Sequence, residues 1–278
     1  MQHKILLTDC PDEQGLIARI TSVCSNYNLN IIKNNEFVDN SHNRFFMRTE
    51  LSGEFKENDF EHDLKEQLPV DGNYRLVTNG RKRIVILVTK EAHCLGDILM
   101  KAAYGDLNVE IAAVIGNYDT LQNLTEKFDI PFHFISHDGL SRSEHEQRIQ
   151  AKIAQYQPEY VVLAKYMRIL TPELVAAHPH RIINIHHSFL PAFIGARPYQ
   201  QAYDRGVKMI GATAHFVTNN LDEGPIIEQD VIHTDHNYSA ERMASAGRDV
   251  EKYVLSQALR FVLQERVFVT GNRTVVFR

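Results

Sequence analysis

Two short polar runs carry the side chains best suited to acid–base chemistry. Asn184, His186 and Ser188 alternate at the end of an apolar stretch, so a strand there would point all three to one side. His215 follows on a second such stretch, and Asp222 stands in a loop flanked by Gly and Pro. An amide beside an imidazole can stabilise a developing oxyanion and exchange protons with it, and a carboxylate can orient or ionise the imidazole. Taken singly, each of these residues is a weak signal: a lone Asn or His at a strand end is more often a structural hydrogen-bonding residue, and a lone Asp in such a loop commonly forms an Asx turn.

The sequence around these residues alternates between strand and helix patterns. Apolar runs at residues 84–88 and 160–164 are typical of strands buried on both faces of a sheet. This alternation predicts an α/β fold with a doubly wound, mostly parallel sheet, whose ligands lie beyond the carboxyl ends of the strands. Further strands are expected at residues 109–115, 132–135, 182–185 and 210–217, helices at residues 94–104, 121–128, 141–156 and 239–263, and a closing hairpin at residues 268–277.

The first part of the chain has a different pattern. Its strands are expected at residues 4–8, 29–38, 44–51 and 74–77, and its helices at residues 14–27 and 59–68. The order strand, helix, strand, strand, helix, strand predicts a ferredoxin-like α+β domain. Because residues 79–83 are polar and basic, they are expected to form a linker. The predicted domains are therefore residues 1–80 and residues 83–278.

The composition excludes several classes of protein. The chain has 278 residues, which suggests two domains at about 150 residues each. Lys and Arg number 30 against 35 Asp and Glu, and the net charge of -5 argues against nucleic acid as a partner. No apolar run approaches the roughly 20 residues of a membrane span, and no signal peptide is recognisable, so no membrane is expected. Three cysteines without a CxxC pair exclude a disulfide framework and indicate a reduced, cytoplasmic location.

The 14 histidines do not predict a metal site. His178 and His180 stand two apart, and His233 and His236 stand three apart, but neither pair has a convincing third ligand or the spacing of a zinc-binding helix. We therefore expect no metal.

Read together, the polar runs form longer motifs that resemble a known family. The motifs are Asn184-x-His186-x-Ser188-Phe189-Leu190-Pro191-x-Phe193-x-Gly195, Gly211-x-Thr213-x-His215-x-Val217 and Asp222-x-Gly224-x-Ile226-Ile227-x-Gln229. In order and spacing they resemble the formyltetrahydrofolate-dependent formyltransferases and hydrolases, and the resemblance covers residues 83–265. It implies that Asn184, His186 and Asp222 form the catalytic centre.

The same resemblance implies roles for neighbouring residues. Thr213 and His215 are expected to support Asp222, and Ser188 is expected to support its own loop. A folate is expected to rest on the segment of residues 163–170, with binding residues Tyr166, Met167, Arg168, Ile169 and Leu170.

In the first domain, a loop meets a helix at the run Asp9-Cys10-Pro11-Asp12-x-x-Gly15-Leu16-Ile17, and this junction resembles that of an ACT regulatory domain. ACT domains usually bind a small amino acid between copies, and the free N–H groups of a helix N-terminus suit a carboxylate. The resemblance therefore implies an amino-acid effector and an even-numbered homo-oligomer. The alternative, that this loop is only a tight turn, stays equally open. The effector residues it points to are Asp9, Pro11, Gly15, Leu16 and Ile17.

The resemblance implies hydrolysis of 10-formyltetrahydrofolate to formate and tetrahydrofolate, which supplies formate for purine biosynthesis and balances one-carbon folate pools. Water is favoured as acceptor because the loop at residues 89–96 has one glycine and lacks an open N–H cradle for a phosphate. His187 and Lys165 also stand where formyltransferases commonly have Pro and Gly. The folate is the substrate, and no tightly bound cofactor is expected. The alternatives are formyl transfer to a small amine such as glycinamide ribonucleotide, and an amino-acid sensor without catalysis.

Overall fold

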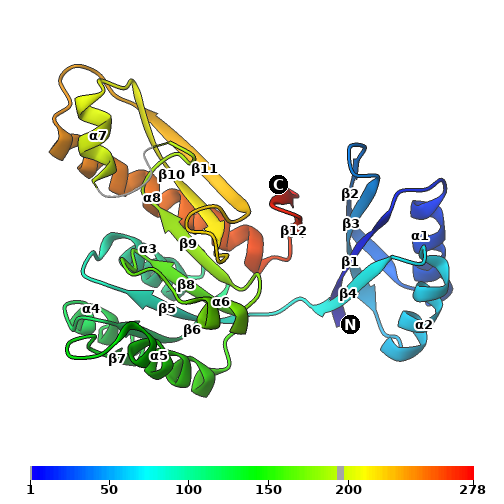
Figure 1. Ribbon diagram of the computed structural model, residues 1–278. Helices are drawn as coiled ribbons and strands as arrows, with labels where there is room; N and C mark the ends of the chain where they lie inside the picture. The colour runs from blue at the N-terminus through cyan, green and yellow to red at the C-terminus, as the bar shows by residue number, and fades with distance from the viewer. Residues whose placement is uncertain (1, 193–196) are drawn as a thin grey trace. The chain divides into compact units, whose positions relative to one another are not determined.

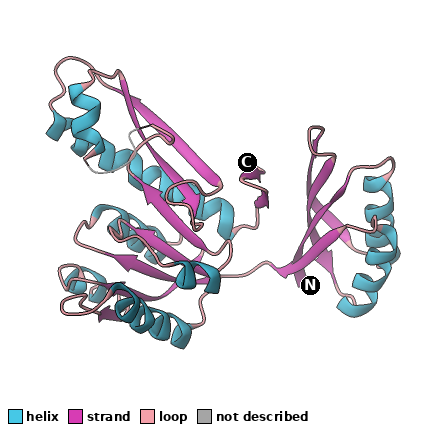
Figure 2. Ribbon diagram, viewed as in Figure 1, coloured by secondary structure: helices cyan, strands magenta, loops and turns pink. Residues whose placement is uncertain are grey.

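The chain folds as two units, and the computed structural model describes residues 2–192 and 197–278. The small unit comprises Met1–Gly80, Gln264–Phe268 and Phe277–Arg278, and the large unit comprises Arg81–Leu263 and Val269–Val276. Figure 2 shows helices packed against a sheet in each unit.

The small unit contains a four-stranded antiparallel sheet in the order β2-β3-β1-β4. Its elements follow one another as strand, helix, strand, strand, helix, strand, the order expected from the sequence. They are β1 (Gln2–Pro11), α1 (Leu16–Asn26), β2 (Asn30–Asp39), β3 (Arg44–Gly53), α2 (Glu57–Gln67) and β4 (Asn73–Thr78).

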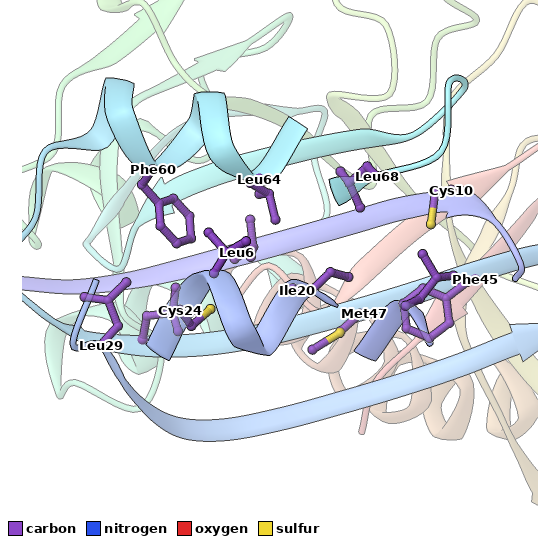
Figure 3. Packing of buried hydrophobic residues seen from close by; sticks show 13 residues of the cluster. Leu6, Cys10, Ile20, Cys24, Leu29, Phe45, Met47, Phe60, Leu64 and Leu68 are labelled. Carbon is purple, nitrogen blue, oxygen red and sulfur yellow. The ribbon is translucent and has the colours of Figure 1, made fainter. Parts of the chain in front are cut away.

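Apolar side chains at helical spacing make the core of the small unit. Ile20 and Cys24 are one turn apart in α1, as are Phe60 and Leu64 in α2, and all four are buried. Figure 3 shows them gathered with Leu6 of β1. Both helices therefore cover the same face of this sheet.

The other face of β3 carries a buried arginine, Arg48, which is 2% exposed. Its Nε donates to the carbonyl of Glu265 at 2.8 Å, and its Nη2 donates to the carbonyl of Gln264 at 2.9 Å. Phe46 packs edge-on against Phe268, with ring centroids 5.5 Å apart. These contacts place Gln264–Phe268 in the small unit, whereas the sequence pattern assigns them to the domain of residues 83–278.

A seven-stranded sheet runs through the large unit in the order β11-β10-β9-β8-β5-β6-β7. Its strands from β7 to β9 are parallel, while β10 is antiparallel to both β9 and β11. The predicted mostly parallel sheet is thus confirmed. Its elements are β5 (Lys82–Val88), α3 (His93–Ala103), β6 (Val109–Gly116), α4 (Gln122–Glu126), β7 (Phe132–Phe134), α5 (Arg142–Tyr156), β8 (Tyr160–Ala164), α6 (Pro172–Ala177), β9 (Ile182–His186), α7 (Pro198–Asp204), β10 (Met209–Phe216), β11 (Ile226–His233) and α8 (Ala240–Leu263), and the hairpin β12 (Val267–Thr270) and β13 (Arg273–Val276) follows them.

Helices cover both faces of this sheet (Figure 1). Val85 and Leu87 of β5 pack with Ile149 and Ile153 of α5 on one face. Because side chains alternate along a strand, the residues between them face the other side, where α3 and α8 pack on the sheet and on each other. This double covering explains why the inner strands read as continuous apolar runs.

The strand β11 is not predicted by the sequence pattern. Glu228 and Asp230 interrupt its apolar residues. It pairs with β10 at the edge of the sheet, where charged side chains are tolerated and discourage further pairing. The short helices α6 and α7 also go beyond the predicted elements.

Within residues 2–192 and 197–278, every helix is too short or too polar to cross a membrane.

Candidate active site

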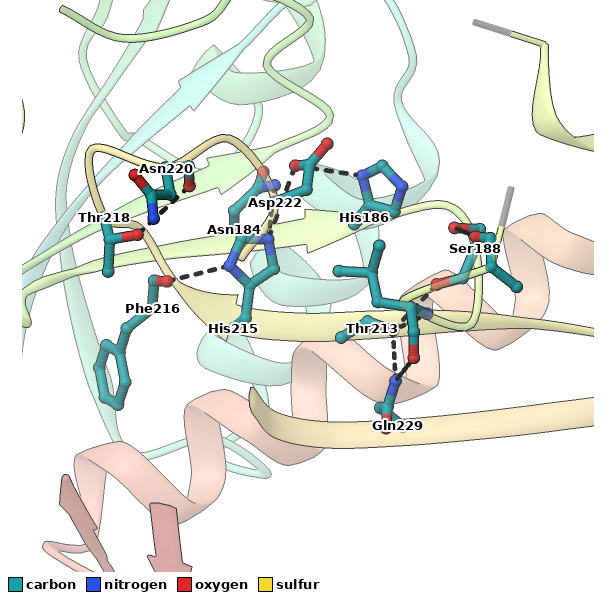
Figure 4. A network of polar contacts seen from close by, with 12 residues as sticks. Asn184, His186, Ser188, Thr213, His215, Phe216, Thr218, Asn220, Asp222 and Gln229 are labelled. Atoms are coloured by element: carbon teal, nitrogen blue, oxygen red, sulfur yellow. Dashed lines mark hydrogen bonds and ion pairs between the residues drawn. The ribbon is translucent and has the colours of Figure 1, made fainter. Parts of the chain in front are cut away.

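The pair of His186 and Asp222 joins the end of β9 to the loop after β10 (Figure 4). His186 is the last residue of β9, and Asp222 adopts a left-handed backbone with φ 57°. Nδ1 of His186 lies 3.3 Å from Oδ1 of Asp222. The other ring nitrogen of His186, Nε2, is buried and has no hydrogen-bond partner among the described residues. The imidazole therefore has one nitrogen held by a carboxylate and one left for a ligand.

Asp222 is kept ionised by its neighbours. Burial raises the pKa of its carboxyl group, but the hydrogen bond and charge of His186, followed by the charge of His215, lower it further. The net pKa lies below the ordinary value of 3.8. At neutral pH Asp222 is thus a carboxylate that can accept a proton or stabilise a charged imidazole.

Asn184 and His215 are opposite each other because β9 and β10 are antiparallel in that register. Nδ1 of His215 donates to the carbonyl of Phe216 at 2.9 Å, so Nε2 is the unprotonated ring nitrogen. The Asn184 amide donates to this Nε2 at 3.3 Å, and Oδ1 of Asp222 lies 3.9 Å from it. The amide orientation is therefore fixed, and its second N–H has no hydrogen-bond partner among the described residues.

Thr213 supports the loop that follows β9 rather than Asp222, as its described hydrogen bonds show. Its hydroxyl donates to the carbonyl of Ser188 at 2.9 Å and accepts from the N–H of Leu190 at 3.0 Å. It also accepts from the amide of Gln229 at 2.8 Å, because Gln229 is its partner on β11. The hydroxyl of Ser188 donates to the carbonyl of Ala192 at 2.7 Å, within the same loop. The sequence pattern does not predict this role of Gln229, because only the pairing of β10 with β11 brings it to Thr213.

A cavity of about 300 Å³ brings the predicted catalytic residues and the predicted folate segment together. Met167 and Ile169 are exposed beside it, whereas the ring of Tyr166 is buried. The backbone N–H of Met167 donates to Thr89, which ties this segment to the loop after β5. Residues that border the cavity include Lys165, Tyr166, Met167, Arg168, Ile169, Leu170, Asn184, His186, His187, His215 and Asp222.

Two groups of side chains among the described residues have atoms close enough to share a metal ion. One is the exposed group of His62, Asp63 and Glu66. The other is the group of His93, Cys94 and Glu251, into which the ammonium group of Lys165 already reaches. The ammonium group of Lys165 thus lies where a metal ion would contact Glu251. That the protein binds no metal stays a prediction.

The predicted effector residues lie around the start of α1 in the small unit. Gly15 precedes the helix with φ 86°, a left-handed backbone that favours glycine, and the helix has no side-chain cap there. Asp9 accepts hydrogen bonds from Arg44. Pro11 ends β1, Leu16 is buried in the core, and Ile17 is exposed.

The motif residues Phe193 and Gly195 lie outside the described residues.

Comparisons with known proteins show the family to which the chain belongs. The sequence profile of the formyl transferase family matches residues 82–259. A formyltetrahydrofolate deformylase of Escherichia coli O6:H1 is 67% identical over 99% of each chain. The crystal structure of a formyltetrahydrofolate deformylase from Pseudomonas syringae pv. tomato superposes with a TM-score of 0.95 at 40% identity, covering 100% of this chain and 95% of that one. That of glycinamide ribonucleotide transformylase 1 from Symbiobacterium toebii gives a TM-score of 0.69 at 28% identity, covering 71% of this chain and 95% of that one. The chain is therefore a member of the formyltetrahydrofolate deformylases, within the formyl transferase family.

Proposed function

We propose that this enzyme hydrolyses 10-formyltetrahydrofolate to formate and tetrahydrofolate. The observation that carries the proposal is the buried, unpartnered Nε2 of His186, on a ring that Asp222 holds from the other side and that borders a cavity. The names of the relatives support the substrate, since they are formyltetrahydrofolate deformylases over nearly their whole length.

In this proposal Asp222 activates the attacking water. Its lowered pKa keeps it ionised at neutral pH, so a carboxylate oxygen is available to the proton of the water. The water oxygen bonds to the formyl carbon, and the carbonyl oxygen gains negative charge as it does so. Asn184, through its second amide N–H, and His186, through Nε2–H when protonated, donate hydrogen bonds to that oxygen.

The reaction ends with cleavage of the bond between the formyl carbon and the folate nitrogen. The proton that Asp222 took from water passes through His186 to this nitrogen, so formate and tetrahydrofolate leave. The distance of 3.3 Å between Nδ1 of His186 and Oδ1 of Asp222 supports this transfer, because it is only slightly longer than an N–H···O hydrogen bond.

The folate is proposed to rest on Tyr166–Leu170. The exposed apolar side chains of Met167 and Ile169 support this assignment, since they flank the cavity and would be covered by a flat ring system. Ser188 and Thr213 act by holding the loop after β9, and no further cofactor takes part in the proposed reaction.

The small unit is proposed to be an ACT-like regulatory domain that binds an amino acid and pairs in an even-numbered homo-oligomer. Its order of elements and the uncapped start of α1 after Gly15 support this. Formate release by the full chain is measured with each free amino acid, and again with Ile17→Asp. We expect one amino acid to change the rate of formate release, and we expect Ile17→Asp to abolish this change. If no amino acid changes the rate, the proposal is contradicted. Sedimentation gives the oligomer size.

The experiment that tests the catalytic proposal is formate release from 10-formyltetrahydrofolate with no amine present. Steady release over many turnovers is expected. If formyl groups leave the folate only after an amine such as glycinamide ribonucleotide is added, the enzyme is a formyltransferase instead.

A further inference from the structure

A second polar cluster, which the proposed reaction does not use, lies buried in the large unit. Its centre is Glu251 of α8, whose side chain is 0% exposed. Nε2 of His93 lies 2.7 Å from one carboxylate oxygen, and the hydroxyl of Tyr199 donates to the other at 2.6 Å. Burial raises the pKa of Glu251, but the hydrogen bond of His93 and the charge of Lys165 bring it down to about 2. Glu251 is thus a buried anion at neutral pH.

Lys165 supplies the matching cation. Its Nζ lies 3.2 Å from Glu251 and 3.7 Å from Glu91, and its side chain is 4% exposed. It follows β8 directly with φ 59°, a left-handed backbone that a residue with a Cβ adopts only under strain. A buried ammonium group on a strained backbone is an unfavourable combination, which the surrounding structure must enforce.

The fold makes room for this cluster at Gly247. A Cβ atom at this position would lie 2.1 Å from the hydroxyl oxygen of Tyr199. Gly247 stands one turn before Glu251 on α8, so its missing side chain lets Tyr199 reach the carboxylate. The hydrogen bond between Tyr199 and Glu251 therefore depends on residues of both α7 and α8.

The cluster adjoins the candidate active site. Lys165 and His187 both border the cavity that His186 and Asp222 border. The ring of His187 lies 5.2 Å from that of His186 and 6.3 Å from that of Tyr199, measured between centroids. Lys165 and its partners therefore fill space next to the reacting residues.

We infer that Lys165, held by Glu251, fills the place of an amine acceptor and so restricts the nucleophile to water. The inference rests on the proposed function. This chain shares its fold with a glycinamide ribonucleotide transformylase, so a side chain that fills this place would distinguish hydrolysis from transfer on one fold. An empty place here would expose the Glu251 carboxylate, which would bind a small primary amine carrying a further hydrogen-bond donor.

With the space open, transfer follows the same bond changes as hydrolysis. The amine nitrogen bonds to the formyl carbon, and the bond from that carbon to the folate nitrogen breaks. The proton lost by the amine goes to the folate nitrogen, so an N-formyl amine and tetrahydrofolate result. Asn184, His186 and Asp222 are unchanged in this step.

The test uses Lys165→Gly and Lys165→Asn in the full chain, because both residues tolerate the left-handed backbone and both leave the space open. Glycinamide is the probe. Formate and N-formylglycinamide are measured by mass spectrometry from 10-formyltetrahydrofolate with a labelled formyl carbon. We expect the ratio of N-formylglycinamide to formate to rise on the order of tenfold to a hundredfold over the unaltered enzyme, the range by which the filling of one subsite changes discrimination.

Two further variants show whether the product ratio depends on the volume of the Lys165 side chain, on its charge or on the strain of a left-handed backbone. Lys165→Met keeps the volume and removes the charge, so its product ratio should match that of the unaltered enzyme. Gln157→Gly makes the corresponding change at an exposed residue of the same unit that also has a left-handed backbone. Its ratio of N-formylglycinamide to formate should stay unchanged. Thermal unfolding shows which variants are folded. The test needs only one of Lys165→Gly and Lys165→Asn to be folded.

The inference is overturned if a folded opening variant releases formate yet forms no more N-formylglycinamide than the unaltered enzyme, or if Lys165→Met gains transfer equally. Failure of the proposed function is seen separately, as absence of formate release by the unaltered enzyme without amine.

Discussion

Nδ1 of His186 lies 3.3 Å from Oδ1 of Asp222, while the other nitrogen of the same ring is buried and unpartnered among the described residues. A buried polar atom without a partner is destabilising, because it has lost its water and gained nothing in exchange. The end of β9 and the loop after β10 thus hold an atom whose missing partner a bound substrate would supply. The catalytic predictions follow from this pairing.

Asp222→Asn is expected to abolish most turnover and to leave folate binding nearly intact. The change is almost isosteric but removes the negative charge that accepts a proton and stabilises a charged His186. Loss of such a group lowers the rate by about 10² to 10⁴. Turnover is compared with the dissociation constant of a non-hydrolysable folate analogue. Near-normal turnover would refute the catalytic role of Asp222. Loss of both turnover and folate binding would make it a structural residue.

His186→Gln is expected to lower the turnover number on the order of 10² to 10⁴, with little change in folate affinity. Glutamine keeps a polar side chain of similar reach but neither carries nor releases a proton near neutral pH. The matched control is His180→Asn, at an exposed histidine whose left-handed backbone asparagine tolerates. Equal turnover of the two variants would contradict the proposed part of His186.

Part of this site could be predicted from the sequence and part could not. The alternation of Asn184 with His186 shows which side chains share a strand face, since that needs only the period of a strand. The bond from Asn184 to His215 depends on the register between β9 and β10, which no local pattern encodes. For the same reason Thr213 was expected to support Asp222, whereas it bonds the loop after β9.

The predicted assignment of residues to the two domains differs from the structure at Gln264–Phe268, where long-range contacts decide. Apolar runs and helical spacing identify the inner strands and the long helices. The return of Gln264–Phe268 to the small unit depends on a buried Arg48, a residue type that usually marks an exposed position. The ion pair of Lys165 and Glu251 likewise joins residues far apart in the chain.

Arg48→Ala is expected to destabilise the protein by about 3–5 kcal/mol, the cost of removing one partner from a buried charged network. It leaves two backbone carbonyls without their donor and Glu50 without a contact at 2.6 Å. Arg19→Ala, which removes a partly exposed arginine that pairs with Glu13, should cost less than about 1 kcal/mol. Urea unfolding measures both values, and similar values for the two variants would contradict the anchoring role of Arg48.

The stability that Glu251 contributes should disappear in acid. Its pKa falls from an ordinary 4.5 to about 2 on folding, against the effect of burial and through His93 and Lys165. A group with a lowered pKa stabilises the folded state above its unfolded pKa, and this contribution is lost as the pH falls through the folded value. The stability difference between the unaltered enzyme and Glu251→Gln should therefore be full above pH 4.5 and shrink toward pH 2.

Urea unfolding across this pH range makes the measurement. Glu241→Gln, at an exposed position in the first turn of the same helix, is the control and should show a small difference that does not shrink in this way. A difference for Glu251→Gln that stays constant down to pH 2 would show that its carboxylate is not held in the ionised form.

Gly247→Ala and Gly96→Ala should change stability in opposite directions. Both glycines lie inside helices, where alanine is favoured by roughly 0.5–1 kcal/mol because glycine loses more backbone freedom on folding. At Gly96 an added Cβ meets nothing within 4 Å among the described residues, so this gain should be realised in full. At Gly247 the added Cβ would lie 2.1 Å from the hydroxyl oxygen of Tyr199. The ring must move, and its hydrogen bond to Glu251 is lost.

The expected result is a higher melting temperature for Gly96→Ala and a lower one for Gly247→Ala. Because displacing Tyr199 also loosens the partners of Lys165, Gly247→Ala should form more N-formylglycinamide than Gly96→Ala, which should match the unaltered enzyme. A Gly247→Ala protein that is as stable as Gly96→Ala would mean that Tyr199 finds an equally good position elsewhere. In that case the space at Gly247 is not required by the buried cluster.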